Sequence, residues 1–402
     1  MTPAFRSSVE EHAARARESL APLLDRATET LPLDAAAGRV TADAVASPVD
    51  LPLFTNSQMD GYAVRASDVA SARASTPVRL PVSQNLPAGP IIVESLVPGT
   101  AARIMTGAPV PPGADAVIPV EDTDAGLDQV AITRGRRTGE YVRSRGSDAR
   151  AGDVLLPAGT LLAPHRLAAL AAAGITEVAV RSRARVAIVS TGSEVVEPGA
   201  PLEPGQLYDT NSVTLPAAAR RAGAEVALVG RVTDDTAALA ATLDAALAAG
   251  AELIVTSGGV SMGAYEVVRE LLEPEGALVG TVAMQPGGPQ AVGAWRGIPV
   301  LSFPGNPVSA LLSFELFLAP VLRELAGLPA ARRRREPLAH DVESVAGKRQ
   351  FLRGRRGDDG IEIVAGPGSH LVAAMAASEL LAVIPEYATH VRRGALVETV
   401  EL

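Results

Sequence analysis

The sequence predicts a multidomain α/β plus β protein whose central domain is a doubly wound parallel sheet. At 402 residues, the chain is too long for one ordinary domain. Its hydrophobic content of 47% is enough for a large buried core. Between residues 181 and 328, short apolar strands alternate with helical segments, a pattern typical of parallel sheets with right-handed crossovers.

The N-terminal half is expected to begin with a helix and continue as β-structure. Residues 8–29 predict an amphipathic helix, because Ser8 and Glu11 have the spacing of a capping box. Proline and glycine then punctuate residues 47–160, and the short alternating segments between them indicate small β-structured units. A second helix is predicted over 165–173, where the glycine that follows would end it.

The central domain alternates strands with helices. We expect strands over 185–190, 225–229, 252–256 and 299–303, and helices over 211–222, 235–249, 264–272 and 307–326. Three of the strands run directly into glycine-bearing turns, in the segments RVAIVSTGSE, ELIVTSGGVSMG and PVLSFPGNPVSA. The carboxyl ends of parallel strands meet at one edge of a sheet, and such turns present unpaired backbone N–H groups there. The pattern therefore predicts a pocket for a phosphorylated ligand.

The C-terminal part is predicted to be a separate β-domain. We interpret the run Arg332–Arg335, which follows Gly327 and Pro329, as a solvated linker. The alternating segments after it, such as GIEIVAG and ELLAVIPE, predict a β-barrel or sandwich of about 70 residues.

The composition excludes several classes of site. Cysteine is absent, so disulfides, thiolate metal sites and a cysteine nucleophile are excluded. The net charge is -9 and no basic stripe is interleaved with aromatic residues, which argues against nucleic acid as a partner. No apolar stretch is long enough to span a membrane, and residues 1–24 lack a signal peptide, so we expect a cytoplasmic protein. Lys348 is the only lysine.

Two loops are candidate ligand sites from their residues alone. The loop Ser257–Gly263 has adjacent glycines that allow a ligand to approach the backbone, and its serines add hydroxyl donors. It matches neither the Rossmann nor the Walker pattern, and a tight strand–helix turn without a ligand would also explain it. In the loop Pro304–Pro307, the start of a helix explains both Asn306, as its cap, and Pro307, in its first turn, without any ligand.

Carboxylates recur at loop positions along the chain. Oxygen ligands without cysteine suit Mg²⁺, which usually takes one or two carboxylates together with substrate phosphates. Each carboxylate alone is more often a surface charge or a helix cap, and Asp235 has the position of a cap. The candidates are Asp60, Asp148, Glu194, Asp234, Asp235 and Glu266.

An ordered set of motifs resembles the molybdopterin molybdenumtransferase family, the MoeA type that includes the E domain of gephyrin. The matching strings are NSQMDGYA, RIMTGAPVPPGADAVIP, RGSDARAGD, STGSE, GQLYDTNS, SGGVSMG, PGNPVSA and GSH. The resemblance implies a homodimer whose active clefts lie between the binding domain of one subunit and the inserted domain of the other. It divides the chain into a connecting domain with an N-terminal helix (1–50 and 146–180), an inserted β-rich domain (51–145), a molybdopterin-binding α/β domain (181–328) and a C-terminal β-barrel (329–402).

The resemblance also implies a reaction and a set of site residues. The reaction is Mg²⁺-dependent insertion of molybdate into adenylylated molybdopterin with release of AMP, and a molybdopterin adenylyltransferase would be the upstream donor. The implied catalytic residues are Asp60, Thr106, Asp148, Glu194, one of Asp234 and Asp235, and Glu266, of which Asp60, Glu194 and Glu266 would bind the metal. The implied ligand-binding residues are Thr191, Gly192, Ser257, Gly258, Gly259, Ser261, Gly263, Pro304, Gly305, Asn306 and Ser369.

One segment departs from the family pattern. Many members have lysines at three positions that are Thr281, Gln285 and Gly288 here. This loss leaves two alternatives open: a paralogue that binds pterin or nucleotide without efficient metal insertion, or a scaffold. If the protein is an enzyme, the positive charge of the missing lysines would come from arginines. The candidates are Arg269, Arg296, Arg349 and Arg353.

Overall fold

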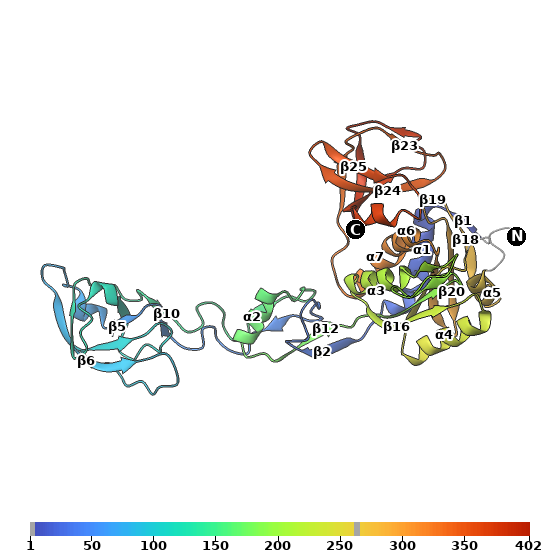
Figure 1. Ribbon diagram of the computed structural model, residues 1–402. Coiled ribbons are helices and arrows are strands. Elements are labelled where there is room, and N and C mark those ends of the chain that lie inside the picture. The colour runs from blue at the N-terminus through green and yellow to red at the C-terminus, as the bar shows by residue number, and fades with distance from the viewer. Residues whose placement is uncertain (1–4, 261–265) are drawn as a thin grey trace. The chain divides into compact units, whose positions relative to one another are not determined.

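The chain folds into two compact units. The structure is a computed structural model that describes residues 5–260 and 266–402. The first unit, unit 1, combines Met1–Glu29 with Arg181–Leu402, and the second, unit 2, comprises Thr30–Val180 (Figure 1). The predicted ligand loops belong to unit 1.

Unit 1 is built on a mixed sheet. Strands β13, β16, β17 and β21 pair in parallel, as the alternating pattern predicts. The prediction of a wholly parallel sheet is corrected at one edge, because β20 runs antiparallel to both β18 and β21. The strands pair in the order β1 (Phe5–Ser7), β18 (Leu278–Val282), β20 (Pro289–Trp295), β21 (Ile298–Phe303), β17 (Leu253–Ser257), β13 (Arg185–Thr191) and β16 (Glu225–Val232).

The helices of this domain follow its strands as predicted, with one interruption. The segment expected as a single helix over 307–326 contains one π-turn between two α-helices, and Pro320 in its second half has no backbone N–H to donate. The bounds are α3 (Asn211–Arg221), α4 (Thr236–Ala248), α5 (Val267–Leu272), α6 (Pro307–Ser313), η4 (Phe314–Leu318) and α7 (Ala319–Leu325).

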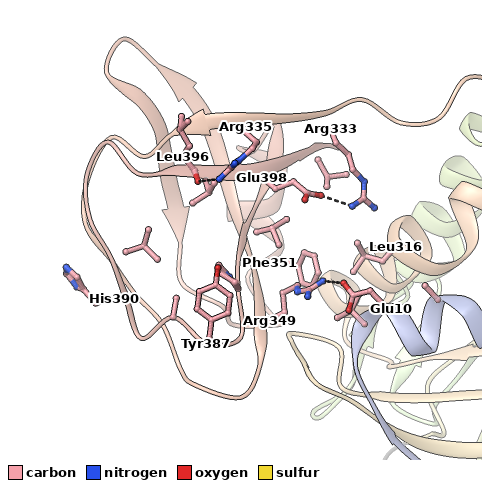
Figure 2. A pocket seen from close by; sticks show the side chains of 18 residues that line it. Glu10, Leu316, Arg333, Arg335, Arg349, Phe351, Tyr387, His390, Leu396 and Glu398 are labelled. Carbon is pink, nitrogen blue, oxygen red and sulfur yellow. Dashed lines mark hydrogen bonds and ion pairs between the residues drawn. The ribbon is translucent and has the colours of Figure 1, made fainter.

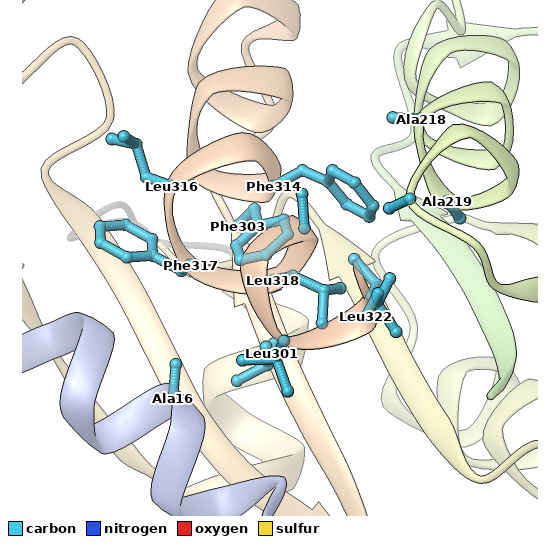
Figure 3. Packing of buried hydrophobic residues seen from close by; sticks show 14 of the residues in the cluster. Ala16, Ala218, Ala219, Leu301, Phe303, Phe314, Leu316, Phe317, Leu318 and Leu322 are labelled. Atoms are coloured by element: carbon cyan, nitrogen blue, oxygen red, sulfur yellow. The ribbon is translucent and has the colours of Figure 1, made fainter. Parts of the chain in front are cut away.

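The core of unit 1 lies on both faces of the sheet. Successive strand residues point to opposite faces, so Ile188 packs in one cluster and Val189 in the other. On the face drawn in Figure 3, Phe303 from β21 packs against Phe314 and Leu322 from the interrupted helix. The central strands are therefore buried on both faces up to the edge where the loops begin.

Helix α1 (Val9–Ser19) packs on the same core. Its predicted capping box is confirmed: Ser8 Oγ accepts a hydrogen bond from the Glu11 N–H, and a Glu11 carboxylate oxygen accepts one from the Ser8 N–H. The helix is shorter than the predicted 8–29 and is followed by a 3₁₀ turn, η1 (Ala21–Leu23). Because its Ala16 side chain is buried in the core, α1 belongs to unit 1, whereas the resemblance places it in the connecting domain.

The C-terminal residues form a mainly antiparallel sheet, which β19 joins in parallel at one edge. The interpretation of Arg332–Arg335 as a linker was wrong, because Arg333 begins a strand that pairs along its length with β28, and Arg333 forms an ion pair with Glu398. The strands pair in the order β19 (Met284–Gln285), β24 (Arg349–Gly357), β26 (Leu380–Ile384), β28 (Leu396–Glu401) and β22 (Arg333–Pro337), and β25 (Gly360–Ala365) pairs with β24.

Unit 2 contains a sheet with strand order β8-β5-β7-β6-β9 and buried clusters on its two faces. Its strands are β5 (Gly61–Val64), β6 (Val78–Leu86), β7 (Ala101–Ile104), β8 (Ala116–Pro119) and β9 (Gln129–Ile132). Its other elements are β2 (Thr28–Pro32), β3 (Val45–Ala46), β4 (Asn56–Ser57), η2 (Ala66–Val69), η3 (Val120–Asp122), β10 (Val142–Arg143), β11 (Val154–Leu156), α2 (Pro164–Ala172) and β12 (Glu177–Arg181).

Small elements complete unit 1. They are β14 (Val195–Val196), β15 (Leu207–Tyr208), β23 (Val342–Glu343), α8 (Val372–Ala376) and β27 (His390–Val391). Within the described ranges, every helix is too short or too polar to cross a lipid bilayer.

Candidate functional site

Three loops meet at the carboxyl ends of β13, β17 and β21. The first loop follows β13 and carries Gly192 and Glu194, the second follows β17 and carries Gly258 and Gly259, and the third follows β21 and carries Gly305. The Gly258 N–H donates to the Phe303 carbonyl at 3.0 Å, which joins the second loop to the end of β21. A Cβ placed on Gly258 would lie 2.6 Å from the Thr191 carbonyl oxygen, and one on Gly305 would lie 3.3 Å from the Gly258 Cα. The three backbones therefore pack in direct contact, which only glycine at these positions allows.

The buried hydroxyls of this edge hold the loops together. Ser257 is 1% exposed and its hydroxyl donates to Ser190 Oγ at 3.4 Å. The Thr191 hydroxyl donates to the Ser257 carbonyl at 3.4 Å. These contacts differ from the expected role of Ser257 as a hydroxyl donor to a ligand, because its side chain is covered by the neighbouring strand.

The first loop is tied to the loop that follows β16. The Ser193 N–H donates to Asp234 Oδ2 at 2.9 Å, and the Asp234 N–H donates to Ser193 Oγ at 3.2 Å. Asp235 instead caps α4, since its carboxylate accepts from the Ala238 N–H at 2.7 Å. Of the two neighbouring aspartates, Asp234 is therefore the one that is hydrogen-bonded to the first loop.

Glu194 places a carboxylate at the rim of the first loop. Its side chain is exposed and folds back over Gly192, where an added Cβ would lie 2.7 Å from Glu194 Oε2. Gly192 has φ of +141°, a conformation that other residues rarely adopt. The glycine thus gives the carboxylate room beside the loop backbone.

Asp60 and Thr106 form a hydrogen-bonded pair in unit 2. The Thr106 N–H and hydroxyl both donate to Asp60 Oδ1, at 2.7 and 2.8 Å. These bonds hold the pKa of Asp60 below its usual value, so the exposed carboxylate stays charged. The next residue must be glycine, because a Cβ on Gly61 would lie 1.9 Å from the Ile118 carbonyl oxygen.

Asp148 is also in unit 2, while Glu266 is in unit 1. Asp148 is exposed, and its N–H donates to the Leu51 carbonyl at 2.9 Å. Glu266 immediately precedes α5. Among the residues that the structure describes, no group of three or more His, Cys, Asp or Glu side chains could hold a metal. The metal set Asp60, Glu194 and Glu266 draws on both units and stays a prediction. Ser261 and Gly263 lie outside the described residues.

A cavity of about 500 Å³, here called the loop cavity, opens beside the second and third loops. It brings together Gly259, Pro304, Gly305, Asn306 and Ser369 from the predicted set. The three positions that depart from the family pattern also line it: Thr281, Gln285 and Gly288. Its remaining lining residues are Val260, Val282, Met284, Pro286, Gly287, Pro289, Ser309, Lys348, Pro367, Gly368 and His370.

Two buried amides that sequence reasoning missed hold the walls of the loop cavity. Gln290 is fully buried and donates to the Gly287 carbonyl at 2.8 Å and to Ser313 Oγ at 2.7 Å. Asn211 donates to the Gly305 carbonyl at 2.8 Å. The sequence feature that could have indicated them is an amide side chain beside an apolar segment or a turn: Gln290 in PQAVGAW and Asn211 in YDTNS. Asn306 occupies the N-cap position of α6, but its side chain makes no capping bond.

The arginines proposed to compensate for the missing lysines are engaged elsewhere. Arg296 pairs with Asp244, Arg269 with Glu273, and Arg349 with Glu10 and Glu386. Arg353 is fully buried and donates to the Gly366 carbonyl, which supports the loop that carries Ser369. Where the structure describes it, the loop cavity is not lined by any of the four.

A second cavity in unit 1, here called the barrel cavity, has a volume of about 790 Å³. It lies between α1 and the C-terminal sheet, and Figure 2 shows Arg349, Phe351, Tyr387 and Leu316 around it. None of the predicted site residues lines it within the described ranges.

Comparisons with known proteins agree with this layout. Three family models match in order along the chain: the MoeA N-terminal region (domain I and II) over residues 7–174, the probable molybdopterin binding domain over 187–324, and the MoeA C-terminal region (domain IV) over 335–402. The matches cover both units and place the three loops inside the probable molybdopterin binding domain.

Individual relatives match over most of their length. Molybdopterin molybdenumtransferase 2 of Mycobacterium tuberculosis is 45% identical over 384 residues, covering 93% of this chain and 95% of the relative. The molybdopterin molybdenumtransferase of a Nostoc species is 43% identical over 317 residues, covering 77% and 72%. The crystal structure of a molybdopterin biosynthesis MoeA protein from Pyrococcus horikoshii superposes with a TM-score of 0.79 at 34% identity, covering 99% of each chain. The chain therefore belongs to the molybdopterin molybdenumtransferase family of enzymes.

Proposed function

We propose that this protein inserts molybdate into adenylylated molybdopterin and releases AMP. The observation that carries the proposal is the direct packing of three glycine-bearing loops at one edge of the sheet, beside a cavity of about 500 Å³. Closely packed loop backbones offer N–H groups to anionic ligands, and both the phosphates of the pterin and molybdate are anionic. The protein's main contribution would be to position the two reactants and balance their charge.

Mg²⁺ is proposed as a required ion. The fit is through Glu194, whose exposed carboxylate stands at the rim of the first loop, and Mg²⁺ usually takes one or two carboxylates together with substrate phosphates. The bound ion would offset the negative charge that gathers when an oxyanion meets a phosphorylated pterin.

The test is AMP release. Purified protein is incubated with adenylylated molybdopterin, Mg²⁺ and molybdate, and AMP is measured by chromatography. We expect AMP to form only when molybdate and Mg²⁺ are both present. Release that does not depend on molybdate would contradict the insertion step, and undiminished release in excess chelator would contradict the requirement for the ion.

Asp60 provides the matched variant. We expect Asp60→Ala to abolish insertion while leaving the fold intact, because its carboxylate is exposed and bonds only the Thr106 loop among the described residues. Asp128→Ala removes the same charge from an exposed position of the same unit and serves as the control. Full activity of the Asp60 variant would remove this residue from the site.

The same assay separates a second candidate function. The uncharged Thr281, Gln285 and Gly288 in the cavity wall favour a paralogue that binds pterin or nucleotide without efficient metal insertion. Such a protein would bind AMP or the pterin in calorimetry and release no AMP during incubation. A scaffold without a ligand site would do neither.

A homodimer is also proposed, from the family resemblance. Light scattering of the purified protein is expected to give twice the chain mass of 41.2 kDa. A fully active species at the mass of one chain would contradict the dimer. A molybdopterin adenylyltransferase remains the proposed upstream donor, because only such an enzyme class supplies the adenylylated substrate.

A further inference from the structure

The loop cavity has an unusual charge balance for this chain. The protein carries 45 acidic and 36 basic residues, yet the described residues that line the cavity include no carboxylate. Lys348 is the only lining residue among them with a permanent positive charge, and it is also the only lysine of the chain. The rest of the described lining consists of glycines, prolines, other apolar residues, uncharged polar residues and His370, so this ammonium dominates the local field.

Backbone pairing places Lys348 at this wall. It immediately precedes β24, and the Arg349 N–H donates to the Ala283 carbonyl at 2.9 Å. One residue further, Gln350 Nε2 donates to Gln285 Oε1 at 2.7 Å. The start of the strand is therefore fixed beside the segment that carries Gln285, which also lines the cavity.

The side chains of Lys348 and its neighbour Arg349 line different cavities. Arg349, the first residue of β24, lines the barrel cavity, whereas Lys348, which precedes the strand, lines the loop cavity. Arg349 is neutralised by Glu10 and Glu386. Lys348 is exposed, and among the described residues it has no ion-pair partner. Its charge is thus available to an anion from solution.

We propose that Lys348 binds an oxyanion group of the substrate in the loop cavity. The inference deepens the proposed function, on which it rests. The anion is either molybdate or the diphosphate of the adenylylated pterin, and both present the same chemistry to an ammonium group. Ser369 and Asn306 supply further polar groups in the lining.

The experiment compares Lys348→Ala and Lys348→Arg with the wild type. Arg392→Ala is the control, because it removes one positive charge from an exposed position of the same sheet domain outside the cavity. We expect Lys348→Ala to weaken the binding of one substrate about tenfold, as for a lost charge-assisted hydrogen bond, and to change kcat much less. A raised KM for molybdate alone identifies molybdate as the anion, and a raised KM for the adenylylated pterin alone identifies the diphosphate.

A charge-rescue variant separates binding from a structural role. An added Cβ on Gly288 would have its nearest neighbours, Thr281 Cγ2 and Val282 O, at 3.5 Å, which is ordinary contact, whereas Gly287 has φ of +99° and would be strained. Gly288→Lys can therefore bring an ammonium group into the same cavity from another lining position. We expect Lys348→Ala/Gly288→Lys to recover most of the lost affinity.

Calorimetry with molybdate alone and with inorganic pyrophosphate alone gives a readout that does not need turnover. Binding by the wild type that is lost in Lys348→Ala supports the inference even if no AMP is released and the proposed function fails. Equal KM values and equal probe binding in the wild type and Lys348→Ala overturn the inference while leaving the enzyme intact. A loss in Arg392→Ala as large as that in Lys348→Ala also overturns it, and a wild type that neither turns over nor binds either probe overturns both.

Discussion

The loop cavity and the barrel cavity lie in the same unit but balance their charges in opposite ways. In the barrel cavity, Arg349 is paired with Glu10 and Arg333 with Glu398, as Figure 2 shows. In the loop cavity, Lys348 faces uncharged walls. The barrel cavity is larger, at about 790 against about 500 Å³. The described lining of the barrel cavity thus holds carboxylates beside its arginines, whereas that of the loop cavity holds one lysine and no carboxylate. We expect this difference, and not volume, to decide which of the two cavities binds an anion.

The two cavities also differ in how closely their backbones pack. The loop cavity stands beside glycines whose replacement would bring side chains into neighbouring backbone, whereas the barrel cavity is lined by side chains of a helix and a curved sheet. Substitutions should therefore affect the first through backbone clashes and the second through lost ion pairs.

The largest effect is expected from Gly258→Ala. Its Cβ would lie 2.6 Å from the Thr191 carbonyl oxygen at a φ of +97°, so the loops must separate. We expect loss of insertion activity and a stability cost of about 1–3 kcal/mol from overpacking. Gly276→Ala, with a similar φ of +91° and open space around it, is the control and should retain activity. An active, stable Gly258 variant would show that the loops need not touch.

Acid is expected to lower the stability of unit 1 through His12. Burial lowers the pKa of His12 on α1 to about 4 from 6.5, and the ring packs edge-on against Phe317. Because the folded pKa is depressed, the unfolded chain binds more protons between these values; the stability is fully present above pH 6.5 and is lost as pH falls toward 4. The expected loss between pH 7 and 5 is about 2 kcal/mol.

The fluorescence of Trp295 measures this loss during urea unfolding, because it is the only tryptophan and lies in unit 1. His12→Gln should flatten the pH dependence while lowering stability at pH 7. A variant with the same pH slope as the wild type would show that another group titrates.

The smallest effect is expected from Arg349→Ala. Its side chain is 22% exposed and joins α1 to the C-terminal sheet through Glu10 and Glu386, so its loss should cost about 1 kcal/mol. The KM values for molybdate and pterin should stay unchanged, in contrast to Lys348→Ala. If Arg349→Ala weakens molybdate binding as strongly, the distinction between the two cavities fails.

Short sequence patterns predicted those features that only a few consecutive residues determine, namely the loops after the strands and the helix caps. The strand–turn–helix segments placed the three loops at one edge, and the Ser8 capping box is present as expected. Asp235 has the capping position that its sequence context suggested, which left Asp234 for the contact with Ser193. These features need only a few consecutive residues to form.

Features that depend on distant partners were beyond local patterns. The antiparallel placement of β20 depends on its pairing with both β18 and β21. The run beginning at Arg332 looks solvated in isolation, yet Arg333 pairs with a strand more than sixty residues away, at Val400. Lys348 meets the loop cavity only because β24 pairs with β19. No periodicity within a segment encodes such contacts.

The assignment of Lys348 and Arg349 to different cavities has a consequence for the pairing of β24. A one-residue slip of β24 against β26 would move each residue to the place of its neighbour and exchange the two side chains between the cavities. The free ammonium would then face the carboxylates of α1, and the guanidinium would enter the ligand side. Relatives of this protein should therefore keep the register of β24 more strictly than the length of the turn before it, because a surface turn absorbs an inserted residue.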